Sequence, residues 1–146
     1  MITMTENNNY EYFETTADIG VTACGESLEN AFINSALGTM NLITSINQIK
    51  PKITKKVEIK SEDIYGLLYD WITELLILLD SDFFIASEYD IKITKNNEYI
   101  LTGNITGDIY NTDLYNYKTE VKAITYHNMD IKKIGDKYKL NFILDL

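Results

Sequence analysis

The sequence contains no arginine: all 13 basic residues are lysines, against 22 aspartates and glutamates, so the formal net charge is −9. Arginine is the side chain that binds phosphate groups and guanine through two parallel hydrogen bonds. Its absence from an acidic chain argues against direct binding of nucleic acid. A surface of this charge instead suits hard cations or a basic protein partner.

Cysteine, histidine and proline each occur only once. The single thiol, Cys24, cannot form an internal disulfide, which fits a reducing compartment, and we interpret it as a small buried side chain. One histidine excludes a His-rich zinc site, and a Ser-His-Asp triad would have to use His127 without any other support. No phosphate-binding loop, nucleophile elbow, HExxH or paired CxxC motif is present.

Long hydrophobic runs are also missing. The most apolar segment, residues 64–79, is too short to span a bilayer and carries Asp70 and Glu74. The first nine residues lack the basic start and apolar stretch of a signal peptide. We therefore expect a cytoplasmic protein without membrane contact. Its 146 residues, 45% of them hydrophobic, predict a single domain at residues 10–146 after a mobile tail at residues 1–9.

Two segments have the apolar spacing of helices. Apolar or small residues recur every three or four positions over residues 27–45, where Ser27 is the candidate N-cap. Ser61 is the candidate cap of a second helix, whose wide apolar face extends from Ile64 to Leu79. Pro51 lies in the connection and prevents the first helix from continuing.

The remaining segments alternate as strands do. The predicted strands are residues 10–14, 18–24, 53–60, 84–95, 98–107, 117–127, 130–134 and 137–146, with a polar loop at 108–116. Sequential hairpins beside two helices predict an α+β fold, a two-layer sandwich with both helices on one face of a largely antiparallel sheet. The last strand keeps its alternation to the final residue, which predicts a docked C-terminus.

Three carboxylates are candidates for a cation site. Asp145 and the terminal carboxylate of Leu146 lie one residue apart, and Asp18 lies in a turn between the first two predicted strands. If the turn lies beside the C-terminus, the three groups supply the oxygen ligands that hard cations prefer. Like charges at that distance need a cation or a proton. The alternative is that Asp18 only closes a hairpin turn.

Residues 119–127, TEVKAITYH, hold three further candidates. On a strand, Glu120 and Lys122 face the same way, either as a surface ion pair or with Lys122 held beside a site. His127 is either a structural residue at the end of a strand or part of a site at the end of the sheet. The loop from Asp108 to Asp113 lacks the ligand pattern of a calcium loop, and we interpret it as a solvated turn.

Four of these segments together resemble the archease family. YFE followed by TADIG resembles the family's opening FEHTADIG, DWITELL resembles its DWLNELL helix, TEVKAITYH resembles TEVKAVTYH, and FILDL resembles its acidic terminus. The motifs occur in the family's order over residues 10–146. Thr15 stands where the family usually has histidine, which puts any role of that histidine in doubt.

The resemblance implies a non-catalytic accessory protein of the RtcB-type RNA ligase, which joins tRNA exon halves with GTP and a divalent metal. Archeases promote guanylylation of that ligase and its repeated turnover. The resemblance also implies a divalent cation, calcium first, with magnesium or manganese as alternatives, held by Asp18, Asp145 and Leu146. Glu120, Lys122 and His127 stay further candidates. We expect a monomer that does not itself bind nucleic acid.

Two other functions remain open from the sequence. The same carboxylates with a metal-bound water could serve a stand-alone metal-dependent phosphoester hydrolase, although no general acid lies nearby in the sequence. Alternatively, the protein is a chaperone-like binding module in which the cation only ties down the last strand, so that cation binding stabilises the fold.

Overall fold

A computed structural model describes residues 9–146, so eight of the nine residues of the predicted tail lie outside the described residues. The elements in order are β1 (Tyr10–Glu14), β2 (Ile19–Gly25), α1 (Leu28–Ile43), a short 3-10 helix (Ile46–Gln48), β3 (Ile53–Ser61), α2 (Ile64–Asp82), β4 (Phe84–Lys95), β5 (Tyr99–Ile109), β6 (Ala123–Ile134) and β7 (Lys137–Asp145). Within this part of the chain, no helix has the length and apolar character that crossing a membrane requires.

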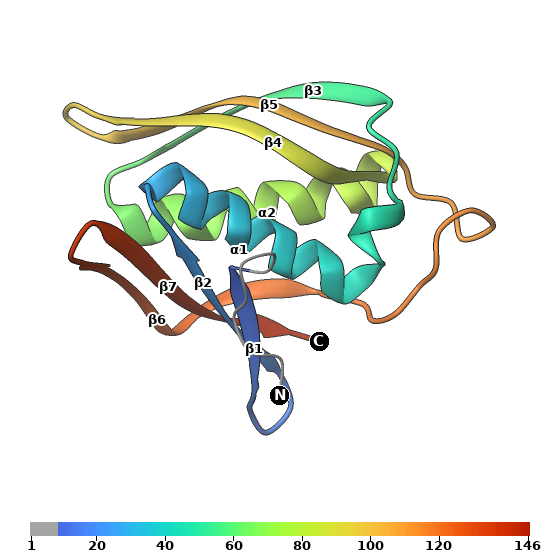
Figure 1. The fold of residues 1–146 in the computed structure, drawn as a ribbon, viewed down its shortest axis with the longest axis horizontal. Coiled ribbons are helices and arrows are strands. Elements are labelled where there is room, and N and C mark those ends of the chain that lie inside the picture. The colour runs from blue at the N-terminus through green and yellow to red at the C-terminus, as the bar shows by residue number, and fades with distance from the viewer. Residues whose placement is uncertain (1–8) are drawn as a thin grey trace.

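The strands form two antiparallel sheets, with the orders β1-β2-β7-β6 and β3-β5-β4. The helices α1 and α2 lie between them, and each contacts both sheets (Figure 1). The α+β class and the antiparallel pairing are confirmed. The arrangement differs from the expectation in having a second sheet on the other side of the helices. Both helices can lie between two sheets because their apolar faces are wide enough to pack against the apolar side chains of each sheet.

Each helix starts at a polar cap. Ser27 caps α1 as predicted, and its hydroxyl accepts a hydrogen bond from the Asn30 N–H at 3.0 Å. The predicted cap Ser61 of α2 is wrong, because Ser61 still pairs with β5 as the last residue of β3. Asp63 caps α2 instead, accepting from the Gly66 N–H at 2.7 Å.

The helices are joined in the core by Trp71, the aromatic residue of the DWITELL segment. Its side chain is fully buried, and its indole N–H donates to the main-chain oxygen of Phe32 on α1 at 3.0 Å. The predicted apolar face of α2 is confirmed, since its buried residues are Leu67, Leu68, Trp71, Ile72, Leu75 and Leu76. The apolar residues of this segment therefore build the core.

The predicted strand at residues 117–127 is wrong in its first half. Residues 117–122 have no regular structure, and β6 begins at Ala123 and continues through the predicted second strand to Ile134. The polar groups of this loop bond to α1 instead: the Lys118 N–H donates to the Ile43 oxygen at 2.8 Å, and the Lys118 ammonium to the Asn41 oxygen at 2.7 Å. Satisfied backbone groups do not need a sheet partner.

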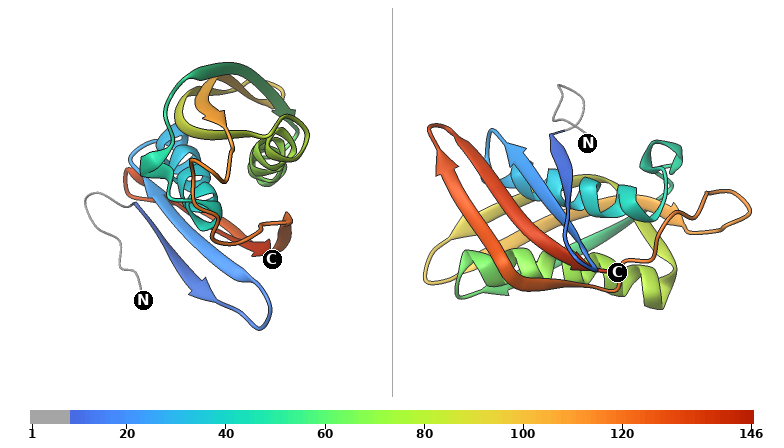
Figure 2. Two further views of the ribbon diagram at one scale, coloured as in Figure 1. Left: turned by 90° about the vertical axis from the view of Figure 1, so that its right-hand side faces the viewer. Right: turned by 90° about the horizontal axis from the view of Figure 1, so that it is seen from below.

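The C-terminus is docked, as its alternation predicted. β7 lies between β2 and β6, and its pairing extends to Ile19 opposite Leu144 and Ala123 opposite Asp145. Figure 2 (right) shows this sheet from the side opposite the helices, with the C-terminus at the end of an inner strand. The terminal residue Leu146 follows this paired strand directly and packs against the core.

Candidate functional site

The register of β2 and β7 brings Asp18 level with Asp145. Ile19 pairs with Leu144 and Gly20 with Ile143, so one further step along both chains places Asp18 opposite Asp145. Residues directly opposite in an antiparallel pair have Cβ atoms about 4.5–5.5 Å apart. Two of the three predicted ligands therefore come from distant parts of the sequence to one end of the sheet.

Both carboxylates also lie on the same face of the sheet. Thr22 and Asn141 are paired, and the Thr22 hydroxyl donates to the Asn141 side-chain oxygen at 2.6 Å. Side chains alternate along a strand, so Asp18 shares the face of Thr22, and Asp145 shares the face of Asn141. This is the face turned away from the helices, and Asp18 is half-buried while Asp145 is exposed.

A hollow of about 250 Å³ lies beside Asp18, and His127 lines it together with Asp18, Thr15, Thr16 and Ile143. His127 does not end a strand, as the sequence suggested, but lies within β6. His127 thus lies beside Asp18, and its role in a site stays a prediction.

An irregular stretch of β6 carries His127 there. Thr125 pairs with Ile143 and Asp130 with Asn141, so residues 126–129 lie opposite the single residue Phe142. Asn128, which also lines the hollow, has a positive φ of 57°. A bulge of this kind bends the strand and redirects its side chains. Sequence alternation alone could not have located it, because no glycine marks the position.

The turn that presents Asp18 is held by Thr15. The Asp18 N–H donates to the Thr15 hydroxyl at 3.3 Å, which closes a local turn. Among residues 9–146, this is the hydrogen bond found for Asp18, and its carboxylate oxygens stay free of protein partners. Thr15 therefore has a role in shaping this turn.

Gly20 of the TADIG segment is required by a neighbouring aromatic ring. A Cβ atom at Gly20 would lie about 2.1 Å from the ring of Phe13, which covers this position from β1. Phe13 and Gly20 are paired across the β1–β2 hairpin. Alternation alone does not predict this contact; the signal for it in the sequence is an aromatic residue and a glycine that flank one turn.

Lys122 is tied to the end of β7 through its backbone. The Lys122 N–H donates to the Asp145 main-chain oxygen at 2.8 Å, while the side chains of Lys122 and Glu120 are exposed. The ion pairs found in residues 9–146 are Lys55–Asp82 and Lys132–Asp130, so the sequence interpretation of a Glu120–Lys122 pair has no support there. Both residues precede β6 and do not share a strand face.

The donors at this end of the sheet suit a hard cation. Asp18, Asp145 and the Leu146 carboxylate supply only oxygen ligands, and His127 is the one nitrogen donor of the adjacent hollow. In residues 9–146, no three side chains of His, Cys, Asp or Glu gather closely enough to hold a metal ion. A three-ligand set at this place thus needs the main-chain carboxylate, and the ligand set stays a prediction.

Two other residues considered as site candidates, Cys24 and Asp108, lie in surroundings typical of structural residues. Cys24 is half-buried, and burial raises the pKa of its thiol, which disfavours the nucleophilic thiolate. The interpretation of the loop beginning at Asp108 as a solvated turn is wrong for Asp108 itself, which is buried at the end of β5. Its carboxylate accepts a hydrogen bond from the Tyr115 hydroxyl at 2.5 Å, which lowers the pKa of Asp108.

Comparisons of the sequence with known proteins all identify the same family. The model of the Archease protein family (MTH1598/TM1083) matches residues 10–146. Protein archease of Pyrobaculum neutrophilum is 36% identical over 140 residues, which cover 94% of this chain and 95% of that protein. Protein archease of Thermococcus kodakarensis is 38% identical over 139 residues, which cover 94% and 98%.

Solved structures agree as well. The solution structure of Methanobacterium thermoautotrophicum protein 1598 superposes with a TM-score of 0.84 at 36% identity, covering 95% of this chain and 99% of that chain. The crystal structure of an archease from Thermotoga maritima, described as a possible chaperone, superposes with a TM-score of 0.60 and covers 92% and 94%. At 22% identity, this second likeness concerns the fold alone.

Proposed function

Because this chain belongs to the archease family, we propose that it is a non-catalytic accessory protein of an RtcB-type RNA-splicing ligase. In this role it promotes guanylylation of the ligase and allows repeated turnover during the joining of tRNA exon halves. The proposal rests mainly on the position of three of the resembling segments. Asp18 of TADIG, His127 of TEVKAITYH and the C-terminal FILDL lie at one end of the sheet β1-β2-β7-β6.

The proposal includes a divalent cation at this end of the sheet. Asp18, Asp145 and the Leu146 carboxylate would hold it, with calcium as the first candidate and magnesium or manganese as alternatives. When bound, the cation supplies positive charge that offsets the repulsion among the three carboxylates. The chain's own residues fix the geometry: Thr15 shapes the turn of Asp18, and the Lys122 N–H anchors the Asp145 backbone.

The charge of the chain supports a basic partner. With a formal net charge of −9 and no arginine, the protein is suited to dock near the basic, RNA-binding cleft of a ligase without holding RNA itself. Lys122 is exposed beside the docked terminus, where it could contact a phosphate or carboxylate of the partner. We expect the chain to act as a cytoplasmic monomer.

The test is multiple-turnover RNA ligation by the cognate ligase at substoichiometric concentration, with labelled GTP to follow guanylylation. Wild-type protein should accelerate both, while Asp18→Ala should not. Asp136→Asn is the matched control, because it removes a carboxylate from the exposed β6–β7 turn, at the opposite end of the same strands. If the wild-type chain leaves an active ligase unchanged, the proposed function is wrong.

Assays of the wild-type chain and its carboxylate variants also distinguish the alternative functions. Phosphoester hydrolysis by the isolated chain, lost in Asp18→Ala, would identify a hydrolase. A chaperone-like module would still support ligation fully when an Asp145→Asn variant is restabilised elsewhere in the fold. The accessory function instead requires that both carboxylate variants lose activation while they remain folded.

A further inference from the structure

A second hollow lies at the C-terminal end of α2. It has a volume of about 260 Å³, and its lining includes the aromatic residues Phe83, Tyr110 and Tyr117 and the acidic residues Asp80 and Glu120. Phe83 and Tyr117 are 62% and 58% exposed. Large exposed aromatic side chains gathered at one hollow mark an interaction surface more often than scattered ones do.

Phe83 adopts a conformation that its side chain disfavours. It has φ 53° and ψ 28°, in the left-handed region, where it ends α2 with its N–H donating to the Leu78 oxygen. This position is usually occupied by glycine or asparagine, and a bulky residue there is strained. The phenyl ring gains little from burial in return, so the fold itself does not account for an aromatic residue at this place.

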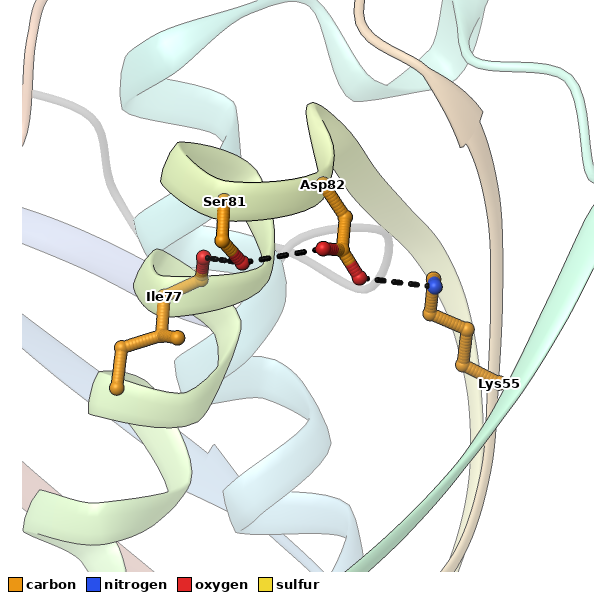
Figure 3. Close-up of polar contacts among 4 residues, drawn as sticks. All are labelled: Lys55, Ile77, Ser81 and Asp82. Atoms are coloured by element: carbon orange, nitrogen blue, oxygen red, sulfur yellow. Dashed lines mark hydrogen bonds and ion pairs between the residues drawn. The ribbon is translucent and has the colours of Figure 1, made fainter.

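The electrostatic character of the hollow is negative. The last turn of α2 has no basic residue, although the carbonyl end of a helix favours cations. Lys55 pairs with Asp82 at 3.1 Å, and Ser81 bridges Asp82 to the Ile77 oxygen (Figure 3). Asp80 and Glu120 take part in neither of the ion pairs found in residues 9–146.

One wall of the hollow, Tyr110, is held by hydrogen bonds at its backbone and at its hydroxyl. The Tyr110 N–H donates to the Phe83 oxygen at 2.5 Å, and the Tyr110 hydroxyl donates to the Asn116 oxygen at 2.9 Å. The Asn116 side chain in turn accepts from Thr44 at the end of α1. An ordered wall lowers the entropy cost of binding.

We propose that this hollow is a docking site for a basic segment of a partner protein, with an arginine side chain inserted between the aromatic walls. A guanidinium group stacks on aromatic rings and pairs with carboxylates at its edge, which matches Phe83 and Tyr117 beside Asp80 and Glu120. A second copy of this chain is a poor occupant, because it carries a net charge of −9 and no arginine. The proposal goes beyond the proposed function, since it requires a basic partner but not a particular one.

The test is an NMR titration of the full chain with the peptide acetyl-Leu-Arg-Leu-amide. The matched control peptide contains citrulline, which has the shape of arginine without its charge. The arginine peptide should give saturable shifts confined to the residues of the hollow, and citrulline should bind at least about tenfold more weakly. Equal binding of both peptides, or shifts spread over acidic residues elsewhere, would overturn the proposal.

Variants that remove two negative charges distinguish binding at the hollow from attraction by the net charge of the protein. Asp80→Asn combined with Glu120→Gln should weaken binding about fivefold or more. Glu58→Gln combined with Asp90→Asn removes the same charge from exposed positions of β3 and β4 and should leave the affinity unchanged. If both pairs weaken binding equally, only net charge is being measured and the hollow is not the site.

Two further measurements address the aromatic wall and the nature of the occupant. Phe83→Gly should weaken peptide binding about threefold while relieving the strained backbone, so the loss would not come from unfolding. Spermidine binding more tightly than the peptide would instead identify a small polycation. Concentration-dependent shifts of the hollow in the chain alone would identify a second copy. Either result would overturn the proposal.

Discussion

Asp18→Asn should have opposite effects on stability depending on whether a divalent cation is present. Asp18 and Asp145 face one another across β2 and β7, so without a cation their charges repel. At about 5 Å in water the repulsion is about 0.8 kcal/mol, and salt screens it further. In a chelator at low ionic strength, the variant should therefore be more stable than the wild type by up to about 0.8 kcal/mol.

Calcium should reverse this order. At a calcium concentration 100 times the Kd, the wild type gains about 2.7 kcal/mol. For 146 residues, about 0.3 kcal/mol corresponds to one degree of Tm, so the gain is about 9 °C. Removing a ligand should weaken binding at least as much as removing a supporting group, by about 10- to 100-fold. At the same calcium concentration the variant then gains only about 0.4–1.4 kcal/mol.

Thermal unfolding in chelator and in calcium, for wild type and variant, measures both effects. Asp136→Asn serves as the control, because it removes one carboxylate from the exposed β6–β7 turn and should follow the wild type in calcium. A variant that melts below the wild type in chelator would show that Asp18 is held by protein contacts. An undiminished gain in calcium would show that Asp18 is not a ligand.

Three further substitutions test the structure away from the cation site. Tyr115→Phe removes the hydrogen bond to buried Asp108 and should lower the free energy of unfolding by about 1–3 kcal/mol. That bond lowers the pKa of Asp108 in the folded state, so the wild-type advantage is complete above the unfolded pKa of about 3.9 and disappears as the pH falls through the folded pKa. Urea unfolding at pH 7 and pH 3 measures it, and an equal difference at both pH values contradicts the assignment. Trp71→Phe leaves the Phe32 oxygen without its indole donor and should cost about 1–3 kcal/mol by the same assay, whereas a neutral result would mean that the bond is not needed. Phe83→Gly should raise the free energy of unfolding by about 1 kcal/mol, and a decrease would show that the exposed ring stabilises the fold.

Elements whose side chains carry their own periodicity could be predicted from the sequence. The apolar face of α2 and the alternation of β7 each follow from local spacing, and both match the buried residues. The docked C-terminus follows from the same alternation. The division of the strands into two sheets could not be predicted, because each strand's pairing partner is set by contacts between distant segments.

The start of β6 shows why alternation alone is insufficient. Residues 119–121 alternate like the strand that follows, but the adjacent Lys118 bonds to α1 through both its backbone and its ammonium. These tertiary bonds keep the preceding loop away from the sheet. The strand predicted at residues 117–127 therefore assigned Glu120 and Lys122 to a strand face, whereas both residues lie in the loop before β6.

At the candidate site, the sequence provided the residue types and the structure provided their arrangement. Nothing local links Asp18 to Asp145; only the register of β2 and β7 does. His127 reaches the same end of the sheet through an irregular stretch of β6 that lacks a recognisable sequence signal. Carboxylates could therefore be chosen as candidates from their chemistry, but the neighbouring histidine could not be placed.

One short segment connects the candidate cation site with the aromatic hollow. Val121 is buried and lines the hollow, while the N–H of the next residue, Lys122, donates to the Asp145 main-chain oxygen. A residue that lines the hollow and a residue that anchors the backbone of Asp145 are thus adjacent in the sequence. A partner whose arginine occupies the hollow would place its neighbouring residues next to the docked terminus. The order of the terminal strand and the binding of a basic segment would then depend on the same short stretch of backbone.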